Sequence, residues 1–153
     1  MLINGMPSIT DVRSSIVSFV EDRDLQYAMT LNENIYLGRS HSLEIVTSGV
    51  RLLPETNGST LGKMFHDSID FSSGQWQMTK ILRGMMNEAS VFIFDEPLTF
   101  LDDDKRTWFN DAVKALIAKG KAVVIIPHES IDIIPDHMLY IHRKEAQHVE
   151  YVQ

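Results

Sequence analysis

The sequence predicts an α/β fold with a parallel sheet, and its second half carries most of that prediction. Residues 90–94 (SVFIF) and 122–126 (AVVII) are continuous apolar runs bounded by polar residues, which is the pattern of buried parallel strands. Between them lies an amphipathic stretch long enough for a helix of about 16 residues. Strand, helix and strand in this order indicate a right-handed crossover in a parallel sheet.

The crossover helix has clear start and stop signals. Residues 102–104 are aspartates, and carboxylates at a helix start cap free N–H groups and complement the helix dipole. Gly120 after Lys119 is a good stop. The apolar residues between these ends repeat at helical spacing and are expected to form a buried stripe of Trp108, Phe109, Ala112, Val113, Leu116 and Ile117.

Short strands are expected near both ends of the chain. Residues 2–4 (LIN) before Gly5 indicate a short strand and a turn, and residues 15–20 (SIVSFV) have strand composition. Residues 137–142 (HMLYIH) and 148–152 (HVEYV) predict two final strands around a turn.

The middle of the chain favours helix. Residues 39–90 are polar and mostly helical in character, interrupted by the turn formers of residues 52–60 (LLPETNGST). An amphipathic helix is expected after Gly74, because apolar residues recur there at helical spacing, at Met78, Ile81, Leu82 and Met85. The sequence leaves open whether Trp76 lies in the core or faces a partner.

Length and composition limit the class of protein. The 153 residues fit one domain with a sizeable core, and the net charge of −7 gives no electrostatic attraction to nucleic acid or to an anionic membrane. The chain has no cysteine, which excludes disulfides and thiolate metal sites. No apolar run approaches the roughly 18 to 20 residues that span a bilayer. The chain is therefore expected to be soluble by itself and to work at a membrane only through a partner.

Three segments carry groups suited to phosphate chemistry. Asp95 and Glu96 follow the first buried strand, at the edge where open α/β sheets bind ligands, and His128 follows the next strand. Asp95 is suited to hold Mg²⁺, and Glu96 to orient or deprotonate an attacking water. Residues 71–77 (FSSGQWQ) open a helix with small residues, as anion-binding helix starts do, although the chain has no G-x-x-x-x-G-K-[ST] phosphate loop.

Four motifs, in order, resemble those of the nucleotide-binding domain of ABC transporters. Residues 71–77 look like the LSGGQ signature with a further glutamine, and residues 91–97 (VFIFDEP) look like the Walker B strand with its catalytic glutamate. Residues 98–102 (LTFLD) resemble the D-loop, and residues 125–130 (IIPHES) the switch-histidine loop. Residues 17–38 resemble the exporter-type stretch from the Q-loop to a T-I-x-E-N-I-x-x-G motif.

This resemblance covers nearly the whole chain and implies its organisation. The fold would be a partial P-loop NTPase (RecA-like) parallel-sheet core with the ABC helical subdomain inserted. Residues 1–153 would form one truncated domain, divided into core strands and Q-loop region (1–38), helical subdomain with the signature (39–90) and core with Walker B, D-loop and switch histidine (91–153). Because Walker A is absent, the 153-residue chain is expected to be inactive alone.

The resemblance also implies a division of labour between two paired domains. In the family, ATP with Mg²⁺ lies between the Walker A of one domain and the signature of a second domain bound head to tail. By that match, the nucleotide held by the partner would be contacted in trans by Ser72, Ser73, Gly74 and Gln75.

Four further residues would act around the bound phosphates. Asp95 would serve the Mg²⁺ site, Glu96 would polarise the attacking water and His128 would contact the γ-phosphate. Asp102, in the D-loop, would couple the two sites across the interface.

Three positions depart from the family pattern. Asp22 stands where the Q-loop glutamine is expected, and its carboxylate could also reach Mg²⁺. Ser73 replaces a glycine of the signature, and Lys63 replaces a glutamate that exporters often carry.

The implied function is that of part of an ABC transporter ATP-binding subunit, an ATPase that couples ATP binding and hydrolysis to export. Its partners would be a second nucleotide-binding domain and transmembrane domains, with no nucleic acid, at the cytoplasmic face of the cell membrane. The alternative is a non-catalytic, degenerate or split module that pairs with an intact nucleotide-binding domain. An ABC-type ATPase of DNA repair or chromosome structure is a weaker third possibility, because the chain has no heptads and no basic surface.

Overall fold

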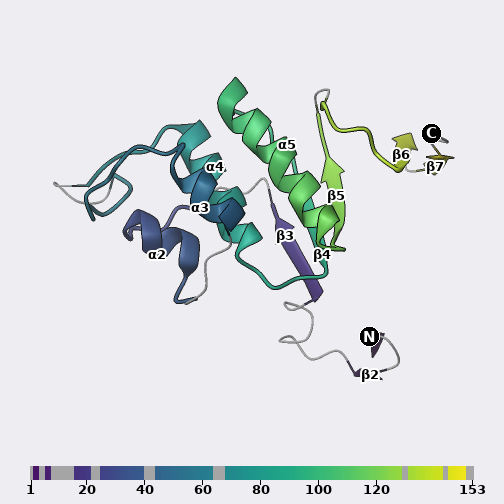
Figure 1. The fold of residues 1–153 in the computed structure, drawn as a ribbon, viewed down its shortest axis with the longest axis horizontal. Coiled ribbons are helices and arrows are strands. Elements are labelled where there is room, and N and C mark those ends of the chain that lie inside the picture. Colours follow the sequence, from purple (N-terminus) through teal and green to yellow (C-terminus); the bar gives the residue numbers. More distant parts are fainter. Residues whose placement is uncertain are drawn as a thin grey trace.

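A computed structural model describes residues 2–3, 6–7, 16–21, 25–39, 44–63, 68–128, 131–142 and 145–150 (Figure 1). Asp22 lies outside these residues, and so does Gly5. In chain order the elements are β1 (Leu2–Ile3), β2 (Met6–Pro7), β3 (Val17–Val20), α2 (Leu31–Tyr36), α3 (Glu44–Val50), α4 (Ser73–Met85), β4 (Val91–Asp95), α5 (Asp103–Ala118), β5 (Ala122–Ile126), β6 (His137–His142) and β7 (Glu145–Glu150).

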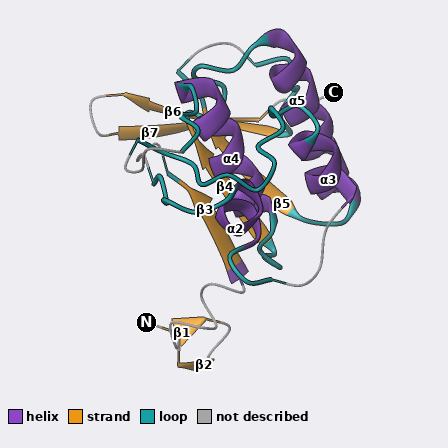
Figure 2. Cartoon of the chain, turned by 90° about the vertical axis from the view of Figure 1, so that its left-hand side faces the viewer, coloured by secondary structure: helices purple, strands orange, loops and turns teal. Residues whose placement is uncertain are grey.

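A parallel three-stranded sheet forms the centre of the fold, as the sequence predicts. Its strand order is β3-β4-β5, with Val17 opposite Val91 and Val91 opposite Ala122. The chain moves in one direction across the sheet, through α2, α3 and α4 and then through α5. Because right-handed crossovers in one direction put their helices on the same face, α4 and α5 lie on one side of the sheet (Figure 2).

Only the helix-covered face of the sheet is well buried in the described structure. On this face Val20, Phe92 and Phe94 are at most 3% exposed, whereas Phe19 on the other face is 51% exposed. Strand β5 alternates between exposed and half-buried residues, so the expectation of a fully buried strand at residues 122–126 is wrong for the described chain. The physical reason is that, among the described strands, β5 borders only β4, and α5 covers one of its faces.

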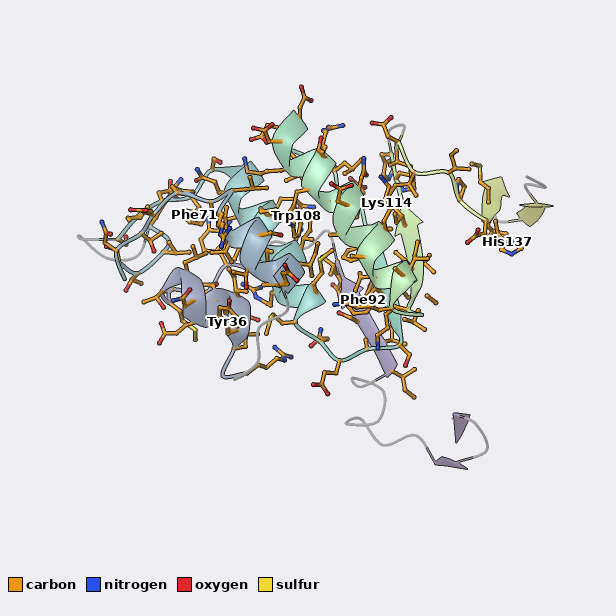
Figure 3. The ribbon with its side chains drawn as sticks, viewed as in Figure 1. Tyr36, Phe71, Phe92, Trp108, Lys114 and His137 are labelled. Atoms are coloured by element: carbon orange, nitrogen blue, oxygen red, sulfur yellow. The ribbon has the colours of Figure 1, made fainter. Side chains whose placement is uncertain are left out.

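Helix α5 begins and ends close to the positions that its sequence signals indicate. Asp102 is the N-cap and its side chain accepts a hydrogen bond from the N–H of Lys105, and Gly120 has a φ of +73° beyond the last turn. Trp108 packs between α5 and α3, where its indole Nε1 donates to the carbonyl of Ile45 over 3.2 Å (Figure 3). Ile117 is 47% exposed and does not join the buried stripe, because it stands at the margin of the face that packs on the sheet.

Helix α4 is the central element of the core. Its four expected core residues, Met78, Ile81, Leu82 and Met85, are all fully buried. Trp76 is also buried, at 4% exposure, and packs at 5.6 Å between ring centroids against Phe71, so it belongs to the core. Gly84 allows close contact with β3, because a Cβ at this position would lie 2.2 Å from a methyl group of Val20.

A buried polar link joins α2 to α4. Thr30 and Glu33 form a capping box at the start of α2. One turn later the buried Asn34 donates from Nδ2 to three backbone carbonyls, including that of Tyr27. Arg83 of α4 donates to the Asn34 carbonyl over 2.6 Å and to its Oδ1 over 2.9 Å. These bonds hold the short helix α2 against the side of α4.

The two ends of the chain form separate antiparallel hairpins. β1 pairs with β2, and β6 pairs with β7, with His137 opposite Glu150. The strand pair near the C-terminus agrees with the prediction, although β7 begins at Glu145, three residues before the expected residue 148. In the part of the chain that the structure describes, no helix is both long and apolar enough to cross a membrane.

Candidate functional site

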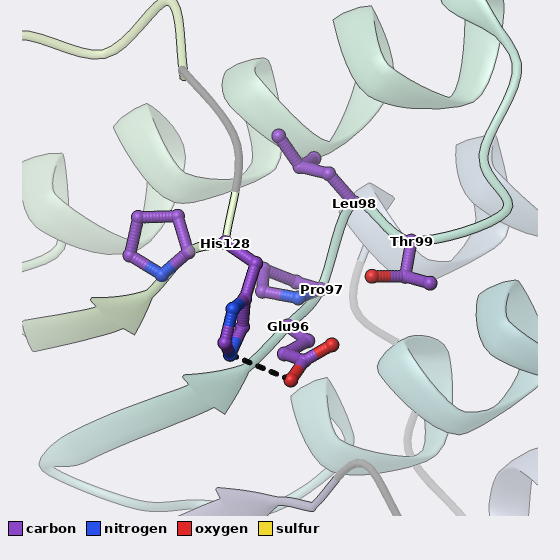
Figure 4. A pocket seen from close by; sticks show the side chains of 6 residues that line it. Glu96, Pro97, Leu98, Thr99 and His128 are labelled. Atoms are coloured by element: carbon purple, nitrogen blue, oxygen red, sulfur yellow. Dashed lines mark ion pairs between the residues drawn. The ribbon is translucent and has the colours of Figure 1, made fainter.

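The carboxyl ends of β4 and β5 bring an acid and a histidine together. Asp95 is the last residue of β4, and Glu96 continues the ladder by donating its N–H to the carbonyl of Ile126 over 2.9 Å. His128 lies two residues beyond β5, and its Nε2 is 2.8 Å from Oε1 of Glu96 (Figure 4). The expectation that His128 lies at the strand end equivalent to Glu96 is confirmed.

The two partners of this pair differ in their exposure to solvent. The Glu96 side chain is 28% exposed, and the His128 side chain is 72% exposed. Partial burial strengthens the hydrogen bond to the carboxylate, because less water screens it. The exposed imidazole can turn away without opening the core, so it can exchange the carboxylate for another acceptor, such as a phosphate oxygen.

The backbone of Glu96 is held in an unusual conformation. Its φ is +49°, a region that residues with a side chain seldom adopt. The carbonyl of Glu96 accepts hydrogen bonds from the N–H of Thr99 over 3.4 Å and from Nε2 of Gln77 over 3.1 Å. Residues 96–99 line a shallow depression together with Pro127 and His128 (Figure 4).

The start of α4 packs directly on the loop that follows Glu96. A Cβ at Gly74 would lie 2.3 Å from the carbonyl oxygen of Phe100, so only glycine fits here without movement. Phe100 itself has a φ of +65° and is 70% exposed. This contact places the start of α4, which resembles the signature, beside the turn at residues 98–102, which resembles the D-loop.

The signature-like residues build a capped helix start. The Ser72 hydroxyl accepts a hydrogen bond from the N–H of Gln75, and the Gln75 side chain accepts one from the N–H of Ser72. Ser72 and Ser73 are both exposed, whereas Gly74 is half-buried. The helix is 13 residues long, and the positive end of its dipole points to the surface around Ser72 and Ser73.

Asp102 is used within the chain. Besides capping α5, its carboxylate pairs with the ammonium group of Lys105. The hydrogen bonds from the side chain and the backbone of Lys105 hold the pKa of Asp102 below its usual range. Asp102 therefore has a structural role in capping α5. A role across an interface would be additional to it.

Lys63 faces an acid in this chain. It pairs with Asp70 across 3.4 Å, and both side chains are largely exposed, so the pair contributes little to stability.

Gln77 has a role in the fold that its sequence pattern did not predict. It is 5% exposed, and its amide reaches the turn after Glu96 from the buried side of α4. The available signal was its position four residues before Ile81, beside the apolar face of α4, because a buried amide requires hydrogen-bond partners.

The acidic groups at the strand end suit a magnesium ion bound together with phosphates. Within the described residues, no cluster of three or more acids or histidines could enclose a metal. Mg²⁺ does not need such an enclosure, because it commonly takes one or two carboxylates, with water and phosphate oxygens as the remaining ligands. Asp95, half-buried at the end of β4 and followed by Glu96, fits that donor set.

Comparison with known proteins places the chain. A family model described as ABC transporter matches residues 3–99, which include the signature-like residues, Asp95 and Glu96. The chain belongs to the ABC transporter family. The predicted family and the α/β fold class are thereby confirmed, and His128 lies beyond the matched range.

Relatives in the ABC transporter family include proteins named for import and for export. The nucleoside import ATP-binding protein NupA of Lactococcus lactis is 30% identical over 78% of this chain and 25% of its own length. The arabinose import protein AraG of Vibrio parahaemolyticus is 28% identical over 82% of this chain and 26% of its own. The macrolide export protein MacB of Mannheimia succiniciproducens is 28% identical over 79% of this chain and 19% of its own length. The chain thus spans about a quarter of the length of the first two of these relatives.

Proposed function

We propose that this chain is part of an ABC transporter ATP-binding subunit, in which it couples ATP binding and hydrolysis to transport across a membrane. The observation that carries the proposal is the pairing of Glu96 with His128 at the ends of two parallel strands, beside a capped helix start. The family membership supports the use of ATP with Mg²⁺.

Each group at the strand ends has a role that follows from its chemistry. Asp95 would hold Mg²⁺, which neutralises developing negative charge on the phosphates when it is bound. Glu96 would accept a proton from the attacking water or orient it, as a partly buried carboxylate can. His128, which now donates to Glu96, would contact the γ-phosphate from its exposed position. Asp22 remains a further candidate for the magnesium site.

The signature face is proposed to act on a nucleotide held by a second domain. Ser72, Ser73, Gly74 and Gln75 lie at the start of α4, where backbone N–H groups and the helix dipole favour a phosphate. The exposed hydroxyls of Ser72 and Ser73 are available to a partner bound head to tail. Asp102, on the loop next to Gly74, would lie near the same interface.

A groove between β3, α2 and α4 is proposed to receive the transmembrane partner. It has a volume of about 160 Å³ and its lining includes exposed apolar residues, three cations and one acid: Phe19, Leu25, Leu37, Arg39, Lys80, Arg83 and Glu21. Nη1 of Arg39 is buried there without a hydrogen-bond partner in the described structure. We expect the partner to supply an amphipathic segment on the cytoplasmic side of the membrane. A carboxylate of this segment would accept the missing hydrogen bond from the guanidinium group of Arg39.

The direction of transport is proposed to be export. The support is the resemblance of residues 30–38 (TLNENIYLG) to an exporter-type motif, while the relatives carry names of both directions. Substrate flux measured in sealed vesicles with ATP on the side of this subunit tests the direction, and accumulation on the ATP side would reverse the assignment.

The central experiment uses the full-length subunit assembled with its transmembrane partner. Glu96→Gln should leave ATP binding intact and stop turnover, because the amide keeps the shape of the carboxylate and loses its basicity. Turnover equal to that of the unmodified protein would refute the role of Glu96 and with it the proposed ATPase site.

A non-catalytic pairing module is the second candidate. The open face of the sheet favours it, since Phe19, Val124 and Ile126 are 51%, 46% and 45% exposed and such faces are normally covered in parallel sheets. Calorimetric titration of the 153-residue chain with ATP and Mg²⁺ discriminates between these cases. Binding only in the presence of a second nucleotide-binding domain would favour the module, and binding by the chain alone would count against both the module and the expectation that this chain holds no ATP by itself.

A further inference from the structure

We propose that Gln77 is a positioning residue for Glu96, one that ties the turn carrying the carboxylate to the signature helix α4. The inference rests on the proposed ATPase function of Glu96. It assigns to the second glutamine of FSSGQWQ a task inside its own chain, in contrast to the outward-facing task of Ser72 and Ser73.

The hydrogen bonds of Gln77 all serve the backbone of one turn. Its Nε2 donates to the carbonyl of Glu96 over 3.1 Å and to the carbonyl of Pro97, also over 3.1 Å. The side chain is buried, so water does not compete for these carbonyls. Because one amide binds two successive carbonyls, it restrains the peptide planes that follow Glu96 and Pro97.

That turn requires external support because its backbone is unfavourable by itself. Glu96 has a φ of +49°, and Phe100 four residues later has a φ of +65°. Within the turn, the bond from Thr99 N–H to the Glu96 carbonyl is long, at 3.4 Å. The two shorter bonds from Gln77 therefore hold Glu96 in the conformation that directs its carboxylate to His128.

Through Gln77, the turn that carries Glu96 is connected to the exposed start of α4. Gln77 lies one turn inside α4, whose first residues include the exposed Ser72 and Ser73. At the same helix start, Gly74 contacts the Phe100 carbonyl at the far end of the turn. A displacement of the helix start by a partner would consequently move both ends of the turn that bears Glu96.

Kinetics of the full-length subunit test the proposal. Gln77→Met keeps the length of the side chain and removes both amide N–H groups, and Gln77→Asn keeps an amide that is too short to reach the turn. For both variants we expect kcat for ATP to fall by about 10²-fold with KM for ATP within about twofold. Adding Glu96→Gln to either variant should cause no further loss beyond that of Glu96→Gln alone, because the two residues act through one group.

A matched control separates positioning from loss of stability. Ser18→Ala removes a buried hydroxyl that donates to the Gly84 carbonyl at the end of α4 and accepts from Nδ2 of Asn87, and neither bond involves the turn that carries Glu96. This control should lower the melting temperature in the same way and leave kcat unchanged. If it lowers kcat as much as Gln77→Met does, the effect is one of general stability and the proposal is overturned.

A structural readout keeps the test independent of catalysis. In the 153-residue chain, NMR should show a nuclear Overhauser effect between the His128 ring and the Glu96 side chain, and Gln77→Met and Gln77→Asn should abolish it. Its persistence in both variants would overturn the proposal. Unchanged kcat in both, with Glu96→Gln inactive, would overturn it and leave the ATPase assignment intact. Full turnover by Glu96→Gln would instead remove the proposed function itself.

Discussion

Gly74→Ala probes the contact between the start of α4 and the turn that carries Glu96. The added Cβ would lie 2.3 Å from the backbone carbonyl oxygen of Phe100. A carbon and a carbonyl oxygen normally approach no closer than about 3.3 Å, so the helix start and the turn must separate by about 1 Å. The oxygen belongs to the backbone, and no side-chain rotation can relieve the contact.

The expected loss of stability follows from this overlap. Forcing one extra carbon into a packed contact costs about 1–3 kcal/mol. Alanine regains at most about 1 kcal/mol through its better helix propensity, and less in the first turn. We therefore expect Gly74→Ala to lower the free energy of unfolding by about 0.5–2 kcal/mol.

Urea denaturation of the 153-residue chain, without nucleotide, measures this effect separately from any role of Gly74 toward a partner. Gly49→Ala is the matched control, because its Cβ would lie 2.5 Å from the ring of Trp108, in a contact remote from Glu96. Both variants should lose stability. In the full-length subunit, Gly74→Ala should also lose ATP turnover by up to about 10²-fold, since the turn with Glu96 moves, and Gly49→Ala should not.

Two results would refute this reasoning. A Gly74→Ala chain as stable as the unmodified one would show that the helix start and the turn are not in contact. Equal losses of turnover in Gly74→Ala and Gly49→Ala would show that activity follows overall stability and not the placement of Glu96.

Three further predictions concern the core, a helix cap and acid sensitivity. Leu82→Ala removes a fully buried side chain of α4 and should lower the free energy of unfolding in urea by about 2–5 kcal/mol; a loss below about 1 kcal/mol would contradict its burial. Thr30→Ala breaks the capping box of α2 and should cost about 0.5–2 kcal/mol by the same measurement, whereas Thr30→Ser should retain most of it. The lowered pKa of Asp102 adds stability above its usual value of 3.8, and this contribution disappears as the pH falls through the lower folded pKa. Asp102→Asn should therefore flatten the loss of stability below about pH 4 in acid titrations followed by circular dichroism, and an unchanged slope would mean that Asp102 is not paired with Lys105.

Local patterns predicted several elements of this protein well. The aspartates at 102–104 and Gly120 placed both ends of α5, because caps and stop signals act within one turn of the chain. The apolar spacing from Met78 to Met85 identified the buried face of α4 for a similar reason. Of the candidate site, the sequence placed Glu96 and His128 at neighbouring strand ends, since parallel strands share an edge.

Other features depended on groups far apart in the chain. The burial of β5 was overestimated because apolar composition shows what a strand can bury and not which elements cover it. Ile117 was assigned to the buried stripe, and its 47% exposure shows that helical spacing alone does not mark where the covered face of α5 ends. Trp76 could not be placed from its spacing, and the ring of Phe71 puts it in the core.

The sequence by itself determined the family resemblance, the unit of β4, α5 and β5, and the acids and histidine of the candidate site. These features are encoded in short stretches of the chain, where residue composition and spacing are enough to predict them. Only the tertiary structure decided how the site is held: the amide of Gln77 on the Glu96 turn, the bare Cα of Gly74 against Phe100, and the single covered face of the sheet. Each depends on distances between segments that meet only after folding, which no local pattern encodes.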